Sequence, residues 1–205
     1  MSTIQFLDYL GTLAFAVSGA LKGVRKGMDV FGVAVLATVT AIGGGTIRDT
    51  LLKADVFWLR DPVYVPLAVA AALGVFAFYR VAQQTVRELL LFDAVGLGVF
   101  TAIGAVKAWD AGTGLVGVVT MACLTGVGGG VLRDVLAGDV PAVLREEVYA
   151  SASIAGAFAF WLLMRAEAGQ GIAVWAAALL TILIRLASIA LRWRLPRRIV
   201  DEHEP

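Results

Sequence analysis

The sequence predicts an all-α polytopic membrane protein with seven transmembrane helices: an inverted repeat of three plus three helices, followed by a seventh helix. Three observations predict it: a strongly apolar composition, a series of apolar spans, and a second half that repeats the first. Of the 205 residues, 60% are hydrophobic and 16% are charged, and the mean hydropathy is +0.85. Soluble domains are roughly 45–50% apolar and about 25% charged. We therefore expect the chain to lie in a lipid bilayer.

Seven apolar spans follow one another along the chain, separated by short polar connections. Each span is close to the ~20 residues that a helix needs to cross the hydrocarbon core. No connection is long enough to form a soluble domain, so residues 1–205 are expected to form one membrane domain with a charged tail at 194–205. The spans cover residues 4–22, 29–52, 62–82, 88–108, 114–137, 147–165 and 170–193.

The fourth to sixth spans repeat the first to third with an offset of 85 residues. Without a gap, 21 of the 57 positions from 8 to 64 are identical to their equivalents. The matched pairs include Asp8 with Asp93, Lys22 with Lys107, Thr40 with Thr125, Arg48 with Arg133, and Asp49 with Asp134. Because each copy holds an odd number of spans, the second copy enters the membrane from the opposite face, as in an inverted-topology repeat. The first repeat covers 4–82 and the second 88–165, which leaves the span 170–193 outside the repeat.

Loop charges predict the orientation. With seven spans, the loops 22–28, 80–87 and 138–147 lie on the same face as the C-terminus. That face carries ten Lys and Arg residues against four on the other: Lys22, Arg25, Lys26, Arg80, Arg87, Arg145, Arg192, Arg194, Arg197 and Arg198, against Lys53, Arg60, Lys107 and Arg165. The positive-inside rule then places the N-terminus outside and the C-terminus in the cytoplasm.

Each repeat carries three consecutive glycines in the middle of an apolar span. Glycine costs roughly 1 kcal/mol in a helix interior, so we expect helices 2 and 5 to be broken there, with free carbonyls near the midplane that can replace water around a monovalent cation. The residues concerned are Gly43, Gly44, Gly45, Gly128, Gly129 and Gly130, with Thr40 and Thr125 adding hydroxyl acceptors. The alternative is that these glycines allow close helix packing.

Charged residues follow both triplets, as Arg48-Asp49 and Arg133-Asp134. Ionisable groups at membrane depth are costly and usually face a partner or a cavity. The repeat topology places Asp8 on the same side as Arg48 and places Asp93 on the same side as Arg133. We therefore expect the contacts Asp8–Arg48 and Asp93–Arg133. The alternative is that these charges are headgroup anchors at the interface.

Three further basic positions are candidates for a role. Lys22 and Lys107 lie at helix ends, where they either snorkel to the interface or control access to a pore. Arg185 lies in the middle of the seventh span with no carboxylate at helical spacing. It is expected to cap carbonyls of another helix or to meet a neighbouring subunit.

Composition argues against several function classes. The chain has one cysteine, one histidine and a net charge of +1. These numbers provide no cysteine or histidine cluster for a metal, no histidine-based catalysis and no basic surface for nucleic acid. We expect neither an enzyme nor a cofactor, and no catalytic or metal-ligating residues.

Two three-helix repeats, a seventh helix and the pattern Gly-Gly-Gly-Thr-Ile-Arg-Asp with Gly-Gly-Gly-Val-Leu-Arg-Asp resemble the prokaryotic TRIC (trimeric intracellular cation) channels. The same sequence domain is also labelled a glycine-transporter domain in bacteria. The resemblance covers about residues 4–193. It implies a homotrimer in the prokaryotic inner membrane, in which each protomer has a pore between spans 1, 2, 4 and 5. That pore would be permeable to potassium and less selectively to sodium.

Two functions remain open from the residues alone. A channel needs a continuous path that binds ions weakly, with the arginines neutralised by neighbouring aspartates. A secondary transporter of a small amino acid such as glycine would use half-helix N-termini to hold a carboxylate and would rock the two repeats against each other.

Overall fold

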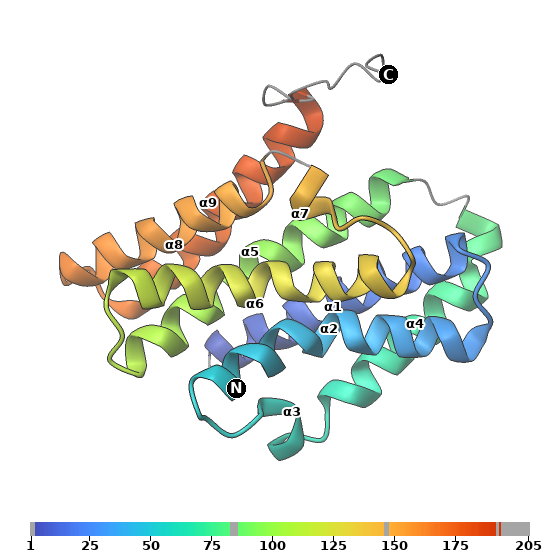
Figure 1. Cartoon of the computed structure of the whole chain (residues 1–205), viewed down its shortest axis with the longest axis horizontal. Coiled ribbons are helices and arrows are strands. Elements are labelled where there is room, and N and C mark those ends of the chain that lie inside the picture. The colour runs from blue at the N-terminus through green and yellow to red at the C-terminus, as the bar shows by residue number, and fades with distance from the viewer. Residues whose placement is uncertain (1–2, 83–85, 146–147, 192, 194–205) are drawn as a thin grey trace, which may run out of the picture.

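The computed structural model describes residues 3–82, 86–145, 148–191 and 193, and within them all regular structure is helical. The helices are α1 (Thr3–Arg25), α2 (Val30–Leu51), α3 (Phe57–Arg60), α4 (Tyr64–Ala82), α5 (Val86–Asp110), α6 (Leu115–Leu136), α7 (Ala142–Arg145), α8 (Ala150–Arg165) and α9 (Gln170–Leu191). In Figure 1, α1, α2, α5 and α6 form the centre, α3 and α4 lie on one side, and α8 and α9 lie on the other. The predicted charged tail, 194–205, falls outside the described residues.

The long helices confirm the all-helical membrane class. Five helices of the described chain (α1, α2, α5, α6 and α9) are long and apolar enough to cross a bilayer. The third and sixth predicted spans correspond to α4 and α8, which contain shorter apolar helical segments, Tyr64–Tyr79 and Ala150–Arg165.

Two one-turn helices, α3 and α7, were not predicted. They occupy equivalent positions in the two repeats, since Phe57–Arg60 and Ala142–Arg145 are offset by 85 residues. Each begins where a backbone N–H donates to the aspartate that follows the glycine triplet: Phe57 N–H to Asp49 Oδ2 at 3.0 Å, and Ala142 N–H to Asp134 Oδ2 at 2.9 Å. The carboxylate thereby satisfies a free donor at the start of the turn.

The contacts between the repeats are reciprocal. A Cβ added to Gly11 would lie 3.1 Å from the Phe100 ring, and one added to Gly96 would collide with the ring of Phe15, the equivalent of Phe100. Likewise Gly44 faces the Thr125 carbonyl and Gly129 faces the Thr40 carbonyl. A patch in which residue i meets j and j meets i is the pattern of a two-fold relation.

The predicted break at the glycine triplets is wrong. Helices α2 and α6 run without interruption through Gly43–Gly45 and Gly128–Gly130. The glycines instead let the two helices touch, because a side chain at Gly44 or Gly129 would overlap a backbone carbonyl of the partner helix. Close packing, the alternative considered for these residues, offsets the low helix propensity of glycine.

Helix α9 packs on the second repeat, against α5 and α8. Small residues make this possible: Gly98 on α5 lies under the Ala178 carbonyl, and Gly156 on α8 lies under Thr181. The face of α9 turned inward is mainly alanine, with Thr181, Arg185 and Ser188 as polar exceptions. The first repeat has no such helix among the described residues.

Candidate functional site: two buried charge clusters

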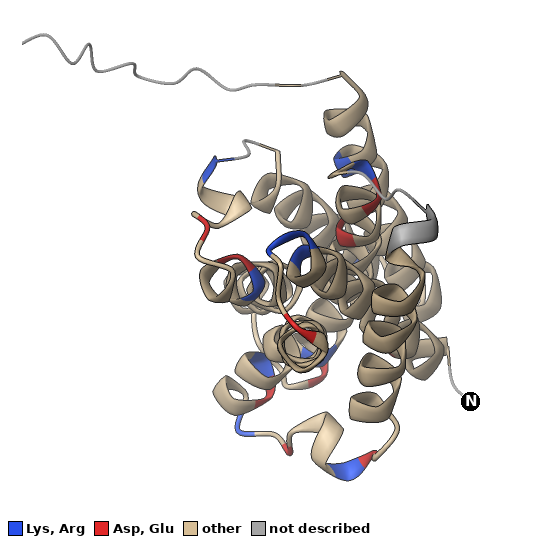
Figure 2. Cartoon of the chain, turned by 90° about the vertical axis from the view of Figure 1, so that its right-hand side faces the viewer, with Lys and Arg blue, Asp and Glu red and all other residues tan. Residues whose placement is uncertain are grey.

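Charged residues gather in groups at a few places along otherwise uncharged helices (Figure 2). Two of these groups are buried and related by the repeat. We name them after the helix that carries their arginine. The α2 cluster consists of Asp8, Arg48, Asp49 and Lys107, and the α6 cluster of Asp93, Arg133, Asp134 and Lys22. Each cluster has two basic and two acidic groups and is formally neutral.

The α6 cluster joins α1, α5 and α6 through one guanidinium. Arg133 Nη1 donates to Asp93 Oδ1 at 2.5 Å, and Arg133 Nε donates to Asp134 Oδ1 at 2.9 Å. Arg133 Nη1 also donates to Ser18 Oγ on α1 at 2.6 Å. Arg133 is 2% exposed and Asp93 1%. The predicted contact Asp93–Arg133 is therefore confirmed.

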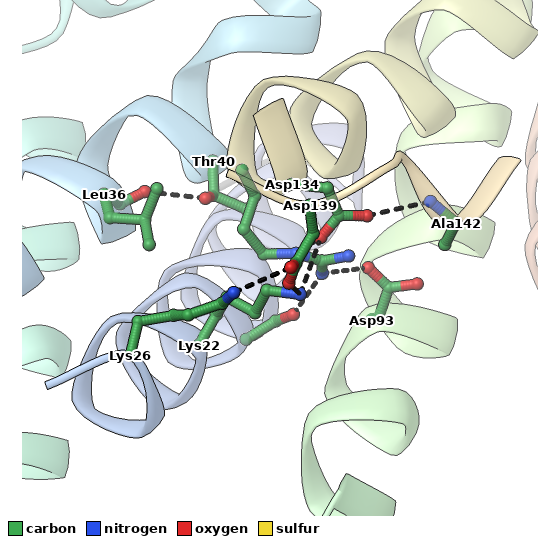
Figure 3. Close-up of polar contacts among 10 residues, drawn as sticks. Lys22, Lys26, Leu36, Thr40, Asp93, Asp134, Asp139 and Ala142 are labelled. Carbon is green, nitrogen blue, oxygen red and sulfur yellow. Dashed lines mark hydrogen bonds and ion pairs between the residues drawn. The ribbon is translucent and has the colours of Figure 1, made fainter. Parts of the chain in front are cut away.

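Lysine residues extend the α6 cluster toward its surface. In Figure 3, Lys22, Lys26, Asp134 and Asp139 point toward one another. Lys22 Nζ lies 3.4 Å from Asp134 Oδ1 and 2.6 Å from Asp139 Oδ2, and Lys26 Nζ lies 2.7 Å from Asp139 Oδ1. Lys22 thus pairs with the aspartate of the other repeat.

The α2 cluster uses the equivalent aspartate and lysine. Arg48 Nε donates to Asp49 Oδ1 at 2.8 Å, and Lys107 Nζ lies 3.3 Å from the same oxygen. Phe57 covers both cations: its ring centroid is 5.7 Å from Arg48 Cζ and 5.9 Å from Lys107 Nζ. Such contacts contribute about 0.5–1 kcal/mol at exposed sites and about 2 kcal/mol or more where the cation is desolvated, and Arg48 is 1% exposed.

Asp8 and Arg48, the other pair expected to be in contact, share no hydrogen bond or ion pair in the described part of the chain. Asp8 Oδ2 instead accepts a hydrogen bond from the Tyr64 hydroxyl at 3.0 Å. Arg48 still attracts the Asp8 carboxylate electrostatically, but its Nη2 is buried without a hydrogen-bond partner in the described part of the chain.

Gly43, Gly44, Gly128 and Gly129 lie in the contact of α2 with α6, whereas Gly45 faces the Phe57 ring and Gly130 faces the Tyr149 hydroxyl. The Thr40 hydroxyl donates to the Leu36 carbonyl and the Thr125 hydroxyl to the Met121 carbonyl, both at 2.6 Å. Gly19 and Gly104 provide the space for these hydroxyls. The two triplets therefore meet, as the repeat predicts. They meet where two unbroken helices cross, and not at a break in either helix.

Sequence reasoning missed several residues that lie beside the clusters: Ser18, Phe57, Tyr64, Asp139 and Tyr149. The repeat contained one signal, because Tyr64 and Tyr149 are equivalent by the 85-residue offset. Arg185 of α9 packs over the Tyr149 ring, with Cζ 4.8 Å from its centroid, and donates to the Val148 carbonyl at 3.5 Å. Arg185 was expected to cap carbonyls of another helix or to meet a neighbouring subunit; the carbonyl that it contacts belongs instead to the turn before α8.

A cavity of about 370 Å³ opens beside the α6 cluster. Arg133 and Asp134 form part of its wall, and so do Lys22, Lys26 and Asp139. At the equivalent place in the first repeat, Phe57 takes the position of Ala142 and covers the α2 cluster. The two clusters thus differ in how they are covered.

The pKa of Asp139 offers a test of the lysine contacts. Hydrogen bonds from Lys22 and Lys26 lower this pKa from 3.8 to about 2. Because the folded-state pKa is depressed, the stabilisation is present above pH 3.8 and is lost as the pH falls through about 2. Carbon NMR of aspartate-labelled protein should show the depressed titration, shifted upward in Lys26→Ala. An unchanged titration in that variant would contradict the contact.

A known protein family matches this chain in two parts, which correspond to the two repeats. A family model described as a glycine transporter matches residues 5–80 and 90–165. A UPF0126 membrane protein of Deinococcus radiodurans is 45% identical over 97% of this chain and 94% of its own length. A UPF0126 inner membrane protein of Escherichia coli is 40% identical over 98% of each chain. These matches indicate a multi-pass protein of the bacterial inner membrane.

Solved structures similar to this chain are TRIC channels. The TRIC trimeric intracellular cation channel orthologue from Rhodobacter sphaeroides has a TM-score of 0.90 and 39% identity, covering 94% of this chain and 100% of that one. A structure that explains conductance through TRIC cation channels has a TM-score of 0.89 and 37% identity, covering 98% and 99%. A prokaryotic TRIC channel in 0.5 M KCl has a TM-score of 0.87 and 34% identity, covering 94% and 98%.

Proposed function

The chain belongs to the family whose model is described as a glycine transporter and whose relatives are UPF0126 membrane proteins. Within this family, we propose that the chain is a homotrimeric, potassium-permeable cation channel rather than an enzyme. Each protomer carries its own pathway between α1, α2, α5 and α6. The two repeats are inverted in the membrane, with the N-terminus outside and the C-terminus in the cytoplasm.

The observation that carries this proposal is the similarity to TRIC cation channels over nearly the whole chain, with TM-scores of 0.87–0.90. It covers the four helices that hold both clusters. The trimer is proposed because the Rhodobacter relative is a trimeric channel. The orientation is proposed from the loop charges.

The clusters suit a cation pathway because they neutralise their own arginines. Unpaired, Arg48 or Arg133 would repel a passing cation, since two unit charges 4 Å apart interact by about 4 kcal/mol at an effective dielectric constant of 20. Asp49 and Asp134 each contact both an arginine and a lysine. These residues, together with Asp8 and Asp93, are proposed as the pore-lining and gating charges.

The roles of the remaining candidates follow from this arrangement. Lys22 and Lys107 lie at the outer ends of the clusters, 19% and 31% exposed in their side chains, and are proposed to control access. The glycine triplets, with Thr40 and Thr125, are proposed as the crossing about which α2 and α6 move. Permeant K⁺ or Na⁺ is the only ion required.

A transport assay tests the proposal. Proteoliposomes loaded with potassium should release it down its gradient when the protein is present, and protein-free liposomes should not. Chemical cross-linking in the same liposomes should give a trimer as the largest abundant species. Absence of potassium flux from protein that cross-links as a folded trimer would contradict the channel.

A glycine transporter is the second candidate, favoured by the description of the matching family model. It predicts saturable uptake of labelled glycine into the same liposomes. It also predicts that excess unlabelled glycine competes with uptake and leaves any potassium leak unchanged.

A further inference from the structure

Phe15 and Phe100 form the apolar contact between α1 and α5 at the centre of the molecule. They are equivalent residues of the two repeats, with ring centroids 5.2 Å apart and an interplanar angle of 62°. Phe15 is 1% exposed and Phe100 3%. Each ring fills the space left by a glycine on the opposite helix, Gly96 or Gly11.

The repeat symmetry is broken at Phe15. Its ring reaches across to α6, where a Cβ on Gly129 would lie 2.9 Å from Phe15 Cδ2. At Gly44, the equivalent of Gly129, the nearest atoms belong to Thr125 and Gly129 rather than to Phe100. The Phe15 ring therefore packs in the junction of α1, α5 and α6.

This junction lies between the two charge clusters. Thr40 meets Gly129 while Gly44 meets Thr125, so α2 and α6 run in opposite directions where they cross. Arg48 and Arg133 each follow the crossing by four residues, about 6 Å of helix. They consequently extend to opposite sides of the crossing, and the Phe15 ring packs beside it.

From this geometry we propose that Phe15 is the apolar seal that separates the two charged ends of the pathway in the closed state. An apolar constriction between polar compartments blocks ions by excluding water, without a charged barrier. The seal rests on the proposed function in one respect: the path that it closes is the one proposed for cations. Opening requires the ring to leave the Gly96 and Gly129 side of the junction.

Thiol labelling tests the seal without any assumption about the transported solute. Cys123 is the single cysteine, so Cys123→Ser provides the background. In it, Phe15→Cys is compared with Phe160→Cys on α8, a site where the native ring is 0% exposed and packs against Trp109. We expect a charged, water-soluble thiol reagent to modify the cysteine of Phe15→Cys at least about tenfold faster than that of Phe160→Cys, a difference in activation free energy of about 1.4 kcal/mol. Equal, slow labelling would overturn the proposal.

Potassium flux provides the second measurement. Phe15→Ala should raise the resting potassium flux from proteoliposomes about tenfold, which corresponds to a free-energy barrier lowered by about 1.4 kcal/mol. Phe160→Ala should leave the flux unchanged. Phe15→Leu, which keeps an apolar side chain, should lie between Phe15→Ala and the native protein and serves if the alanine variant does not fold. A conducting native protein with unchanged flux in both Phe15 variants would overturn the seal and leave the channel intact.

The two proposals fail in different ways. Fast labelling of Phe15→Cys with no potassium flux from any variant, the native protein included, would support the seal and overturn the channel. The seal would then close a path for another solute, and glycine uptake would be the measurement to repeat with Phe15→Ala.

Discussion

Gly44→Ala and Gly129→Ala are expected to be among the most destabilising single changes in this protein. A methyl group at either site would overlap the carbonyl of Thr125 or Thr40 in the partner helix. Backbone cannot rotate away as a side chain can, so α2 and α6 must separate. Overpacking typically costs 1–3 kcal/mol and here should reach about 3 kcal/mol or more. Thermal unfolding in detergent should show a clear drop in Tm.

Gly74→Ala is the matched control. Gly74 also lies within a long helix, α4, but a Cβ there would meet nothing within 4 Å. Alanine should therefore leave stability unchanged or raise it by about 0.5–1 kcal/mol, the usual helix preference over glycine. If Gly44→Ala behaved like Gly74→Ala, the close crossing of α2 and α6 would not exist.

Removal of the buried guanidinium is the second large effect. Arg133→Ala leaves Asp93 and Asp134 without their principal counter-charge in an environment where Arg133 is 2% exposed. Breaking a buried ion pair by removing one partner costs about 3–5 kcal/mol. We expect Arg133→Ala to lower Tm strongly and to change potassium conductance in the protein that remains folded.

Two further variants distinguish the loss of the buried ion pair at Arg133 from the loss of any positive charge. Arg60→Ala removes an exposed pair with Asp55, in which the side chains are 73% and 65% exposed, and such pairs contribute about 0–1 kcal/mol. The double variant Arg133→Ala with Asp93→Asn should regain part of the lost stability, because one uncompensated charge is gone. Additive losses in the double variant would show that the two residues do not interact.

The repeat explains why part of the site was predictable. Matching residues 85 positions apart placed Asp93 and Arg133 on one side of the membrane, and their contact followed from topology alone. For Asp8 and Arg48 the same argument predicted a contact, but the hydrogen bond that Asp8 accepts comes from the Tyr64 hydroxyl. Topology predicts which residues lie at the same depth in the membrane. The packing of the side chains around them decides which of these residues form hydrogen bonds with each other.

The glycine triplets were misread because the low helix propensity of glycine was given more weight than close helix packing, the alternative considered. Propensity measures an isolated helix, and in α2 and α6 contact with the partner helix offsets the deficit of glycine. The pairing of Lys22 with Asp134 was missed for a related reason, since it depends on how α1 approaches α6. The helices α3 and α7 have four residues each, too few to show a helical period.

Single-channel recording tests the central claim most directly. Purified protein in a planar bilayer with potassium on both sides should give unitary currents that are absent from protein-free membranes and altered by Arg133→Ala. Saturable glycine uptake by the same preparation, without unitary potassium currents, would contradict the account and identify the transporter instead.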